Sequence, residues 1–189
     1  LERLENEHNG GILRATPRMR ALAQNMRALL RMGVWAVVEQ VAAGKFDPRA
    51  SEAEFGPGKA LPAIRIRTKA GVALLSGKID RLDTCEALGA LRIIDYKTGN
   101  TPFRYEDIYY GLKLQLPLYL QAAAAALGHR PAGAFYMSVK EPVIDENKQR
   151  LESEIKRAFR QEGLVLSEAE VVSAMDQTID GESLVVNVR

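Results

Sequence analysis

The predicted architecture is built around the stretch Leu91-Arg92-Ile93-Ile94-Asp95-Tyr96-Lys97, in which an apolar run leads into two charged residues. This pattern is typical of a buried β-strand that carries charges at its end. Side chains alternate across a strand, so Asp95 and Lys97 are expected on the same side. Burying either charge is costly unless it is paired or bound to a metal. Asp95 and Lys97 could therefore form either a surface salt bridge or a functional pair.

Length and composition are those of an ordinary globular protein. The 189 residues suit one domain, or one domain with a helical appendage, and are 47% hydrophobic and 26% charged. A net charge of +2 neither indicates nor excludes nucleic acid, because a local basic groove needs no global excess. The single cysteine, Cys85, excludes an internal disulfide framework and a cysteine-built metal site. No apolar run reaches about 18 residues, so no membrane span is predicted.

The N-terminus has neither an initiator methionine nor a signal-peptide core. We therefore expect a fragment of a longer cytoplasmic chain. The expected divisions are residues 1–16 as a remnant of that chain, 17–176 as the folded domain and 177–189 as a truncated tail or edge strand. Within the domain we expect an N-terminal helix (17–44), a central core (61–140) and C-terminal helices (145–176).

Residues 17–44 are predicted to form a long helix. Thr16 suits the N-cap, Pro17 the first helical position and Gly44 the end. Its basic first part fits either a solvated face or a DNA-contacting face. The apolar residues with helical spacing are Met19, Leu22, Met26, Leu29, Leu30, Val34, Val37, Val38 and Val41.

A loop over residues 45–61 and three antiparallel strands are predicted next, at 63–68, 72–80 and 91–97. The second half is expected to contain a helix over 108–127 kinked at Pro117, a strand over 134–139, an amphipathic helix over 145–161, a capping box at 167–170 that opens a short helix, and an edge or truncated strand over 183–189. The predicted class is mixed α/β, with a small mixed sheet flanked by helices.

Two carboxylates are expected to meet at the ends of neighbouring strands, Asp80 on the second and Asp95 on the third, with Lys97 beside them. Two carboxylates, water and a phosphate oxygen suit Mg²⁺ or Mn²⁺. Such a metal acidifies its bound water and neutralises charge on a phosphoryl group. Lys97 could orient or deprotonate that water and stabilise the transition state. Gly77 would leave room beside the site.

Gln115 and Tyr119 are four residues apart and share one face of the following helix. In isolation such a pair is one hydrogen-bonding residue and one core aromatic residue. After an Asp-x-Lys strand, the two become candidates to hold the substrate backbone and to orient the lysine.

Three motifs occur in order: Gly77-x-Ile79-Asp80-Arg81, then Ile94-Asp95-Tyr96-Lys97-Thr98-Gly99, then Tyr109-Tyr110-Gly111-Leu112-x-Leu114-Gln115-Leu116-Pro117-Leu118-Tyr119-Leu120. Together they resemble the RecB-type branch of the PD-(D/E)xK nucleases, most closely the C-terminal nuclease domains of AddB-type helicase–nucleases. The loop Glu54-Phe55-Gly56-Pro57-Gly58 and the strand Gly133-Ala134-Phe135-Tyr136 add to the resemblance.

The resemblance implies a restriction-endonuclease-like fold and Mg²⁺-dependent hydrolysis of DNA, with exonuclease and endonuclease action both open. It implies Asp80 and Asp95 as metal ligands, with the carbonyl of Tyr96 as a further ligand, and Lys97 as the catalytic lysine. Gln115 and Tyr119 match the family's Gln-x-x-x-Tyr motif.

Several charged residues can be interpreted in two ways. Glu54 matches the family's upstream acid or is a solvated loop residue. Four basic residues are either DNA-backbone contacts or ordinary surface charges: Lys78, Arg81, Arg104 and Lys113. Asp83 is interpreted as a turn residue without a role.

The chain departs from the family at its histidine and its cysteines. RecB-type nucleases have an upstream histidine, but neither His8 nor His129 lies in a matching motif, so that ligand is expected before Leu1. AddB-type domains commonly hold an iron–sulfur cluster on four cysteines, and Cys85 is the single cysteine here. No cluster is expected within these 189 residues.

Two functions are compatible with these features. The first is a metal-dependent deoxyribonuclease domain of a bacterial double-strand-break repair helicase–nuclease, cutting single-stranded DNA beside an AddA-like partner subunit. The alternative is a DNA-binding or scaffolding module with little activity in isolation. The intact set of Asp80, Asp95 and Lys97 favours the nuclease.

Overall fold

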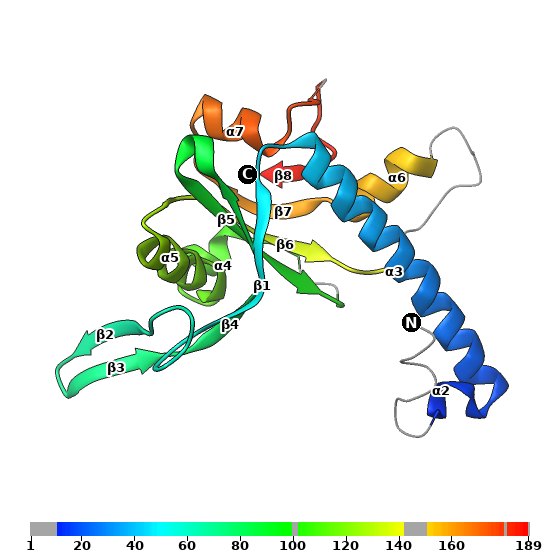
Figure 1. The fold of residues 1–189 in the computed structure, drawn as a ribbon, viewed down its shortest axis with the longest axis horizontal. Coiled ribbons are helices and arrows are strands. Elements are labelled where there is room, and N and C mark those ends of the chain that lie inside the picture. The colour runs from blue at the N-terminus through cyan, green and yellow to red at the C-terminus, as the bar shows by residue number, and fades with distance from the viewer. Residues whose placement is uncertain (1–10, 100–101, 142–150, 180, 189) are drawn as a thin grey trace.

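A six-stranded mixed sheet forms the centre of the molecule, and a separate two-stranded hairpin projects from it (Figure 1). The computed structural model describes residues 11–99, 102–141, 151–179 and 181–188. The helices in this part of the chain are α2 (Ile12–Ala15), α3 (Pro17–Ala43), the short 3-10 turn η2 (Glu86–Leu88), α4 (Tyr105–Tyr109), α5 (Gln115–Leu127), α6 (Leu151–Ala158) and α7 (Ala169–Met175). The strands are β1 (Asp47–Phe55), β2 (Ile64–Thr68), β3 (Gly71–Leu75), β4 (Gly77–Cys85), β5 (Ala90–Lys97), β6 (Arg130–Ser138), β7 (Gln161–Val165) and β8 (Val186–Val188). The predicted mixed α/β class is confirmed.

The strand order of the sheet is β1-β4-β5-β6-β7-β8. Strand β5 pairs antiparallel with β4 and parallel with β6. The parallel pair is connected through α4 and α5, as parallel strands require a crossover. Six of the eight residues of β5 are buried, which explains its nearly continuous apolar run.

Two hydrophobic cores cover the two faces of the sheet. On one face, Ile93 packs in a cluster with Ala123 of α5. On the other face, Ile94 packs in a cluster with Ala36 of α3 and Met175 of α7. Alternation along β5 therefore directs Asp95, two residues after Ile93, towards the α5 side.

The strand assignment before residue 85 is wrong in two places. Residues 47–55, predicted as a loop, form the edge strand β1 and pair with β4, while β2 and β3 form their own hairpin outside the central sheet. The predicted second strand is divided between β3 and β4, and β4 continues to Cys85, so Asp80 lies inside a strand. The charges and Pro48 of β1 hide its strand character, but both are tolerated at a sheet edge.

Three assignments in the second half also need correction. The predicted helix over 108–127 is two helices, and Pro117 lies in the first turn of α5, where a missing N–H is tolerated. The helix predicted to Gln161 ends at Ala158, and Gln161 begins the unpredicted strand β7; residues 145–150 lie outside the described residues. Helix α7 has Glu168 at its N-cap without a side-chain cap bond, so the capping box is not formed.

Helix α3 has the predicted ends but packs differently from the predicted pattern. The Thr16 hydroxyl accepts a hydrogen bond from the Met19 N–H at 3.2 Å. Its buried positions are mainly small residues, and an apolar stripe remains exposed: Leu22, Met26, Leu30, Val34 and Val38. No helix in the described ranges combines the length and apolar character needed to cross a bilayer.

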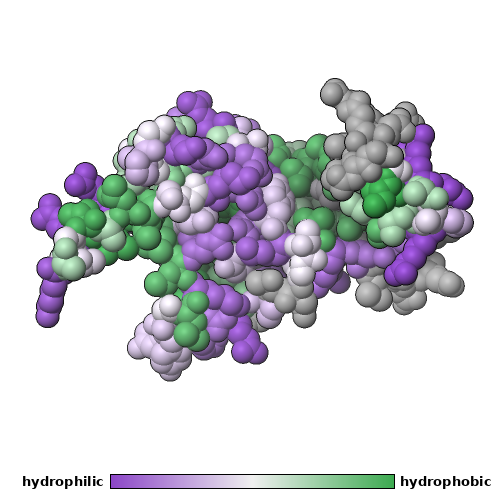
Figure 2. Space-filling view, turned by 90° about the horizontal axis from the view of Figure 1, so that it is seen from below, coloured by the Kyte–Doolittle hydropathy of each residue, from purple (hydrophilic) through white to green (hydrophobic). Residues whose placement is uncertain are grey.

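The β2–β3 hairpin also exposes apolar side chains. Ile66, Val72 and Leu74 are all exposed on it. Figure 2 shows hydrophobic residues gathered on this projection, at the left of the view. An isolated hairpin buries little apolar surface, so its side chains remain in contact with solvent.

Candidate active site

Two carboxylates lie beside the end of the β4–β5 pairing. The paired register ends with Arg81 opposite Ile94, and Asp80 and Asp95 are the next residues along the two strands. The backbone N–H of Tyr96 donates to Oδ2 of Asp80 at 2.9 Å. Asp95 is buried, with 7% of its surface exposed, and Asp80 is half-buried. The convergence expected from the two strands is therefore present.

Both oxygens of Asp95 have a side-chain partner. Lys97 Nζ lies 2.6 Å from Oδ2, as expected for neighbours on one face of a strand. The amide Nε2 of Gln115, at the start of α5, donates to Oδ1 at 2.9 Å. The Lys97 ammonium also lies over the ring of Tyr136, 5.2 Å from its centroid. Helix α5 thus fixes the orientation of an acid that β5 provides.

Burial and charge pairing set the ionisation of this group. Burial raises the pKa of the Asp95 carboxyl, and the charge of Asp80 adds to the rise, while Lys97 opposes it. Partial burial works to lower the pKa of Lys97, but its hydrogen bond to Asp95 and the charge of Asp95 outweigh this and raise it. Lys97 is therefore a cation at neutral pH. Among the roles predicted for Lys97, this charge state suits stabilisation of negative charge better than proton removal from the water.

Tyr119 occupies a different part of the site from Gln115. Its ring packs edge-to-face on Phe55 with centroids 4.9 Å apart. Both rings lie against Gly77: a Cβ there would be 2.7 Å from Phe55 carbons and 2.7 Å from the Tyr119 hydroxyl oxygen. The room predicted beside Gly77 is filled by these two side chains, which joins α5 to β1 and β4.

The carboxylate chemistry fits a hard divalent cation. Asp95 Oδ2 is buried, and Lys97 is its one partner among the described residues. A carboxylate oxygen with unused lone pairs is the type of ligand that such cations bind, commonly one or two at a time with waters. No group of three His, Cys, Asp or Glu side chains suitable for a metal occurs within the described part of the chain. Asp80 and Asp95 are the predicted carboxylates that could hold such an ion.

Three of the remaining predicted site residues are in exposed or partly exposed ion pairs, one is exposed without an acidic partner among the described residues, and Arg81 is buried. Glu54 is in strand β1, not in a loop, and lies 2.7 Å from Lys59. Lys78 pairs with Glu52, and Lys113 lies 2.8 Å from Asp107. Arg104 is exposed directly before α4 and has no acidic partner among the described residues.

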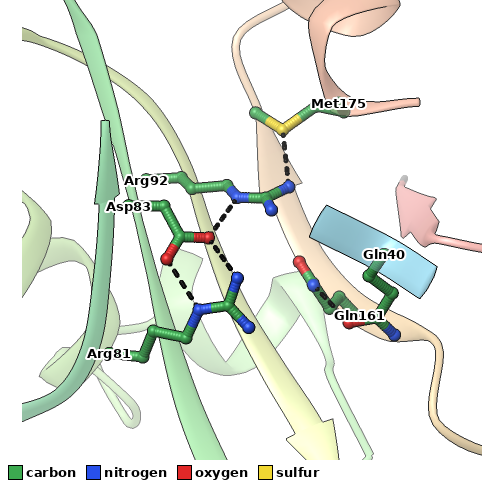
Figure 3. A network of polar contacts seen from close by, with 6 residues as sticks. All are labelled: Gln40, Arg81, Asp83, Arg92, Gln161 and Met175. Carbon is green, nitrogen blue, oxygen red and sulfur yellow. Dashed lines mark hydrogen bonds and ion pairs between the residues drawn. The ribbon is translucent and has the colours of Figure 1, made fainter. Parts of the chain in front are cut away.

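Arg81 does not present a free charge to DNA, because it belongs to a buried polar network that sequence reasoning missed. It donates to both oxygens of Asp83, at 2.6 and 2.7 Å, and Arg92 donates to Asp83 at 3.0 Å. Figure 3 shows the two guanidinium groups directed at this carboxylate, with Met175 accepting from Arg92. Asp83 is therefore a buried strand residue and not a turn residue. The available signal was the alternating Arg-x-Asp on β4, opposite an arginine on β5.

The two histidines and the cysteine lie away from the carboxylate pair or outside the described region. The His129 ring nitrogen Nδ1 is 2.9 Å from the carbonyl oxygen of Leu127, after the end of α5. Cys85 is buried at the end of β4. His8 falls outside the described residues.

A profile of the PD-(D/E)XK nuclease superfamily matches residues 2–184. The chain belongs to this superfamily. The family resemblance and the restriction-endonuclease-like fold predicted from the motifs are thereby confirmed. The superfamily is named after an acid, one spacer residue and a lysine, and Asp95-Tyr96-Lys97 has this order in the sequence.

Relatives of this PD-(D/E)XK domain include proteins named as one subunit of an ATP-dependent helicase/deoxyribonuclease. The one from Thermoanaerobacter sp. (strain X514) is 35% identical, with 93% of this chain and 16% of the relative aligned. Those from Ruminiclostridium cellulolyticum and Clostridium novyi (strain NT) are 32% and 33% identical; the alignments cover 94% and 100% of this chain and 17% and 18% of the relatives. The chain spans about a sixth of the length of these relatives.

Proposed function

We propose that Asp80, Asp95 and Lys97 form the centre of a Mg²⁺- or Mn²⁺-dependent deoxyribonuclease that hydrolyses phosphodiester bonds of single-stranded DNA. The observation that carries the proposal is that Asp80 and Asp95 meet beside the last β4–β5 pair, with Asp80 bonded to the Tyr96 N–H and Lys97 paired with Asp95. Membership of the PD-(D/E)XK superfamily and the word "deoxyribonuclease" in the relatives' names support it.

In the proposed reaction, the oxygen of a water molecule attacks phosphorus, and the bond from phosphorus to the leaving sugar oxygen breaks. The water gives up a proton and the leaving oxygen takes one. Asp80, Asp95 and the carbonyl of Tyr96 would hold a metal ion, which supplies acidified water and charge neutralisation when bound. The Lys97 ammonium stabilises the negative charge that grows on the phosphoryl oxygens. Gln115 keeps Asp95 in the required orientation.

We propose further that this domain works within a DNA-repair assembly. The relatives' names describe one subunit of a helicase/deoxyribonuclease, which supports a longer protein with an AddA-like partner that delivers unwound DNA. A DNA substrate also fits the cytoplasmic location predicted from the sequence. The domain boundaries predicted above belong to the same proposal.

The test compares Lys97→Ala with a closely matched lysine variant, Lys156→Ala. Lys156 Nζ lies 2.8 Å from Glu39 and 5.5 Å from the centroid of Trp35, with 30% of its side chain exposed, against 27% for Lys97. It lies on α6, which packs on the α3 side of the sheet. End-labelled single-stranded DNA is incubated with each protein in Mg²⁺, in Mn²⁺ and in EDTA.

We expect Lys97→Ala to lose at least about 100-fold in cleavage rate, and Lys156→Ala to stay within about threefold of wild type. Equal rates for wild type and Lys97→Ala would refute the assigned role, and absence of cleavage by wild type would favour the scaffolding function. Asp80→Ala and Asp95→Ala should weaken Mn²⁺ binding in calorimetry. Comparison of linear with circular single strands shows whether cleavage requires an end.

A further inference from the structure

Three tyrosines stand exposed on and directly after the short helix α4. Tyr105 is 53% exposed, and Tyr109 and Tyr110 are each 72% exposed. The rings of Tyr105 and Tyr109 are nearly parallel, with centroids 6.5 Å apart, and those of Tyr109 and Tyr110 meet edge-to-face at 5.2 Å. We call these three residues the tyrosine cluster. Aromatic rings of this size normally bury much of their surface, so a contiguous exposed group indicates a binding surface.

A hydrogen-bonded turn connects the tyrosine cluster to the candidate active site. The backbone N–H groups of Leu112 and Lys113 both donate to the carbonyl of Asp107, at 2.7 and 3.0 Å, and close the turn between α4 and α5. The Lys113 side chain then pairs with the Asp107 carboxylate. Two residues later, Gln115 donates to Asp95. A short, internally bonded turn therefore separates the tyrosines from the catalytic acid.

Tyr136 gives independent evidence that the chain around α4 lies beside the site. Its ring centroid lies 6.3 Å from that of Phe103, two residues before Tyr105. The Lys97 ammonium lies 5.2 Å from the centroid of the same ring, and Asp95 is the partner of Tyr136 across β5 and β6. Tyr136 therefore contacts both the site and the segment that leads into α4.

We propose that the tyrosine cluster is a base-stacking platform that holds single-stranded DNA next to the candidate active site. The proposal rests on the function proposed above, since it assumes that the adjacent site receives a DNA strand. Exposed aromatic faces stack on any base, so such a surface binds single strands without sequence preference. Exposed Arg104 at the start of α4 adds a cation for the phosphates. Bases that stack on the cluster would place a neighbouring phosphate within reach of Asp95 and Lys97.

The test separates base stacking from phosphate attraction. Fluorescence anisotropy in EDTA measures the affinity of the 189-residue chain for labelled oligo(dT) and for an abasic oligomer of equal length and charge. The variants are Tyr105→Ala/Tyr109→Ala/Tyr110→Ala, the corresponding triple phenylalanine variant, and Leu112→Ala. Leu112 is 74% exposed on the same turn and serves as the non-aromatic control.

We expect the triple alanine variant to lose at least about tenfold in affinity for oligo(dT), the effect of one stacked base, and to bind the abasic oligomer as wild type does. The triple phenylalanine variant and Leu112→Ala should retain the preference for oligo(dT). Wild-type binding that does not distinguish the two oligomers would overturn the platform, as would an equal loss for both in the triple alanine variant. Such results would indicate a protein-docking surface.

The binding test and the cleavage test fail independently. If wild type prefers oligo(dT) but never cleaves it, the platform stands and the proposed hydrolysis fails. If wild type cleaves and the triple alanine variant binds and cleaves as wild type does, the hydrolysis stands and the platform fails. Thermal unfolding of every variant checks that the fold is retained.

Discussion

Single residues around the site are constrained by what lies against them, and Gly77 and Asp83 show two different constraints. Gly77 is constrained by space, since Phe55 and the Tyr119 hydroxyl occupy the volume that a side chain would need. Asp83 is constrained by charge, since it is the carboxylate shared by two buried arginines. The absence of a side chain at Gly77 allows Tyr119 to keep its position. The bonds of Asp83 to Arg81 and Arg92 help to hold β4 against β5.

Gly77→Ala should destabilise the fold by about 1–3 kcal/mol, because the new methyl group would lie 2.7 Å from Phe55 ring carbons and 2.7 Å from the Tyr119 hydroxyl oxygen. It should also slow cleavage, since Tyr119 must move. Gly99→Ala is the control, because nothing lies within 4 Å of a Cβ at that position. Urea unfolding and cleavage rates measure the two effects. If Gly77→Ala is as stable as wild type, the side chains of Phe55 and Tyr119 can shift at little cost, and the steric constraint at Gly77 is refuted.

Asp83→Asn should cost about 3–5 kcal/mol of unfolding free energy, because it leaves Arg81 and Arg92 buried without a counter-charge. Asp107→Asn removes a carboxylate from the partly exposed pair with Lys113 and should cost less than about 1 kcal/mol. Denaturant midpoints of the two variants test this. Similar losses for both would contradict a special contribution from the buried network.

At the scale of elements, the site depends on where α5 begins. Gln115 is the first residue of α5 and the one that reaches Asp95. The apolar periodicity alone predicts one continuous helix that begins at residue 108. The turn closed by Asp107 instead separates α4 from α5, which frees the tyrosine cluster from the core and sets the start of α5.

Pro117→Ala should change the unfolding free energy by less than about 1 kcal/mol, because Pro117 lies in the first turn of α5, where no intrahelical N–H bond is lost. Gln121→Pro, at an exposed position in the middle of the same helix, should cost about 3 kcal/mol or more. Thermal melts followed by circular dichroism measure both. A large gain in helix content from Pro117→Ala would instead support a kinked continuous helix.

At the scale of the whole molecule, small residues and the hydrogen bonds of Gln40 attach α3 to the sheet side of the molecule. Gln40 of α3 donates to the carbonyl of Phe159 at 2.8 Å, and Gln161 of β7 donates to Gln40 at 2.8 Å (Figure 3). A Cβ on Gly33 would lie 3.4 Å from the Phe159 ring, so the helix and the chain before β7 approach closely there. These contacts are on the side of the sheet opposite to α5.

Gln40→Leu should therefore destabilise the fold by about 1–3 kcal/mol, because it leaves the Phe159 carbonyl and the Gln161 amide buried without this partner. Gln24→Leu, at an exposed position of the same helix, should stay within about 0.5 kcal/mol of wild type. Cleavage per folded molecule should be unchanged in both, which chemical unfolding combined with activity assays can check. Reduced cleavage by folded Gln40→Leu would give α3 a part in the reaction.

Much of the molecule was predictable from local pattern. The apolar run of β5, the caps of α3 and the α/β class follow from periodicity and from residues adjacent in the chain, which act over a few positions. The convergence of Asp80, Asp95 and Lys97 follows from alternation along two successive strands. The four-residue spacing of Gln115 and Tyr119 placed both side chains on one face of a helix. In the structure Gln115 contacts Asp95, whereas Tyr119 packs on Phe55.

Contacts between distant segments settled the rest. Strand β1 lacks an apolar alternation and is a strand because β4 supplies its hydrogen-bond partners, and β7 likewise depends on β6 and β8. Asp83 is buried because arginines on its own strand and on β5 neutralise it, which no local pattern shows. An edge strand and a buried charge are each stable only through a partner elsewhere in the chain, so the folded arrangement determines both.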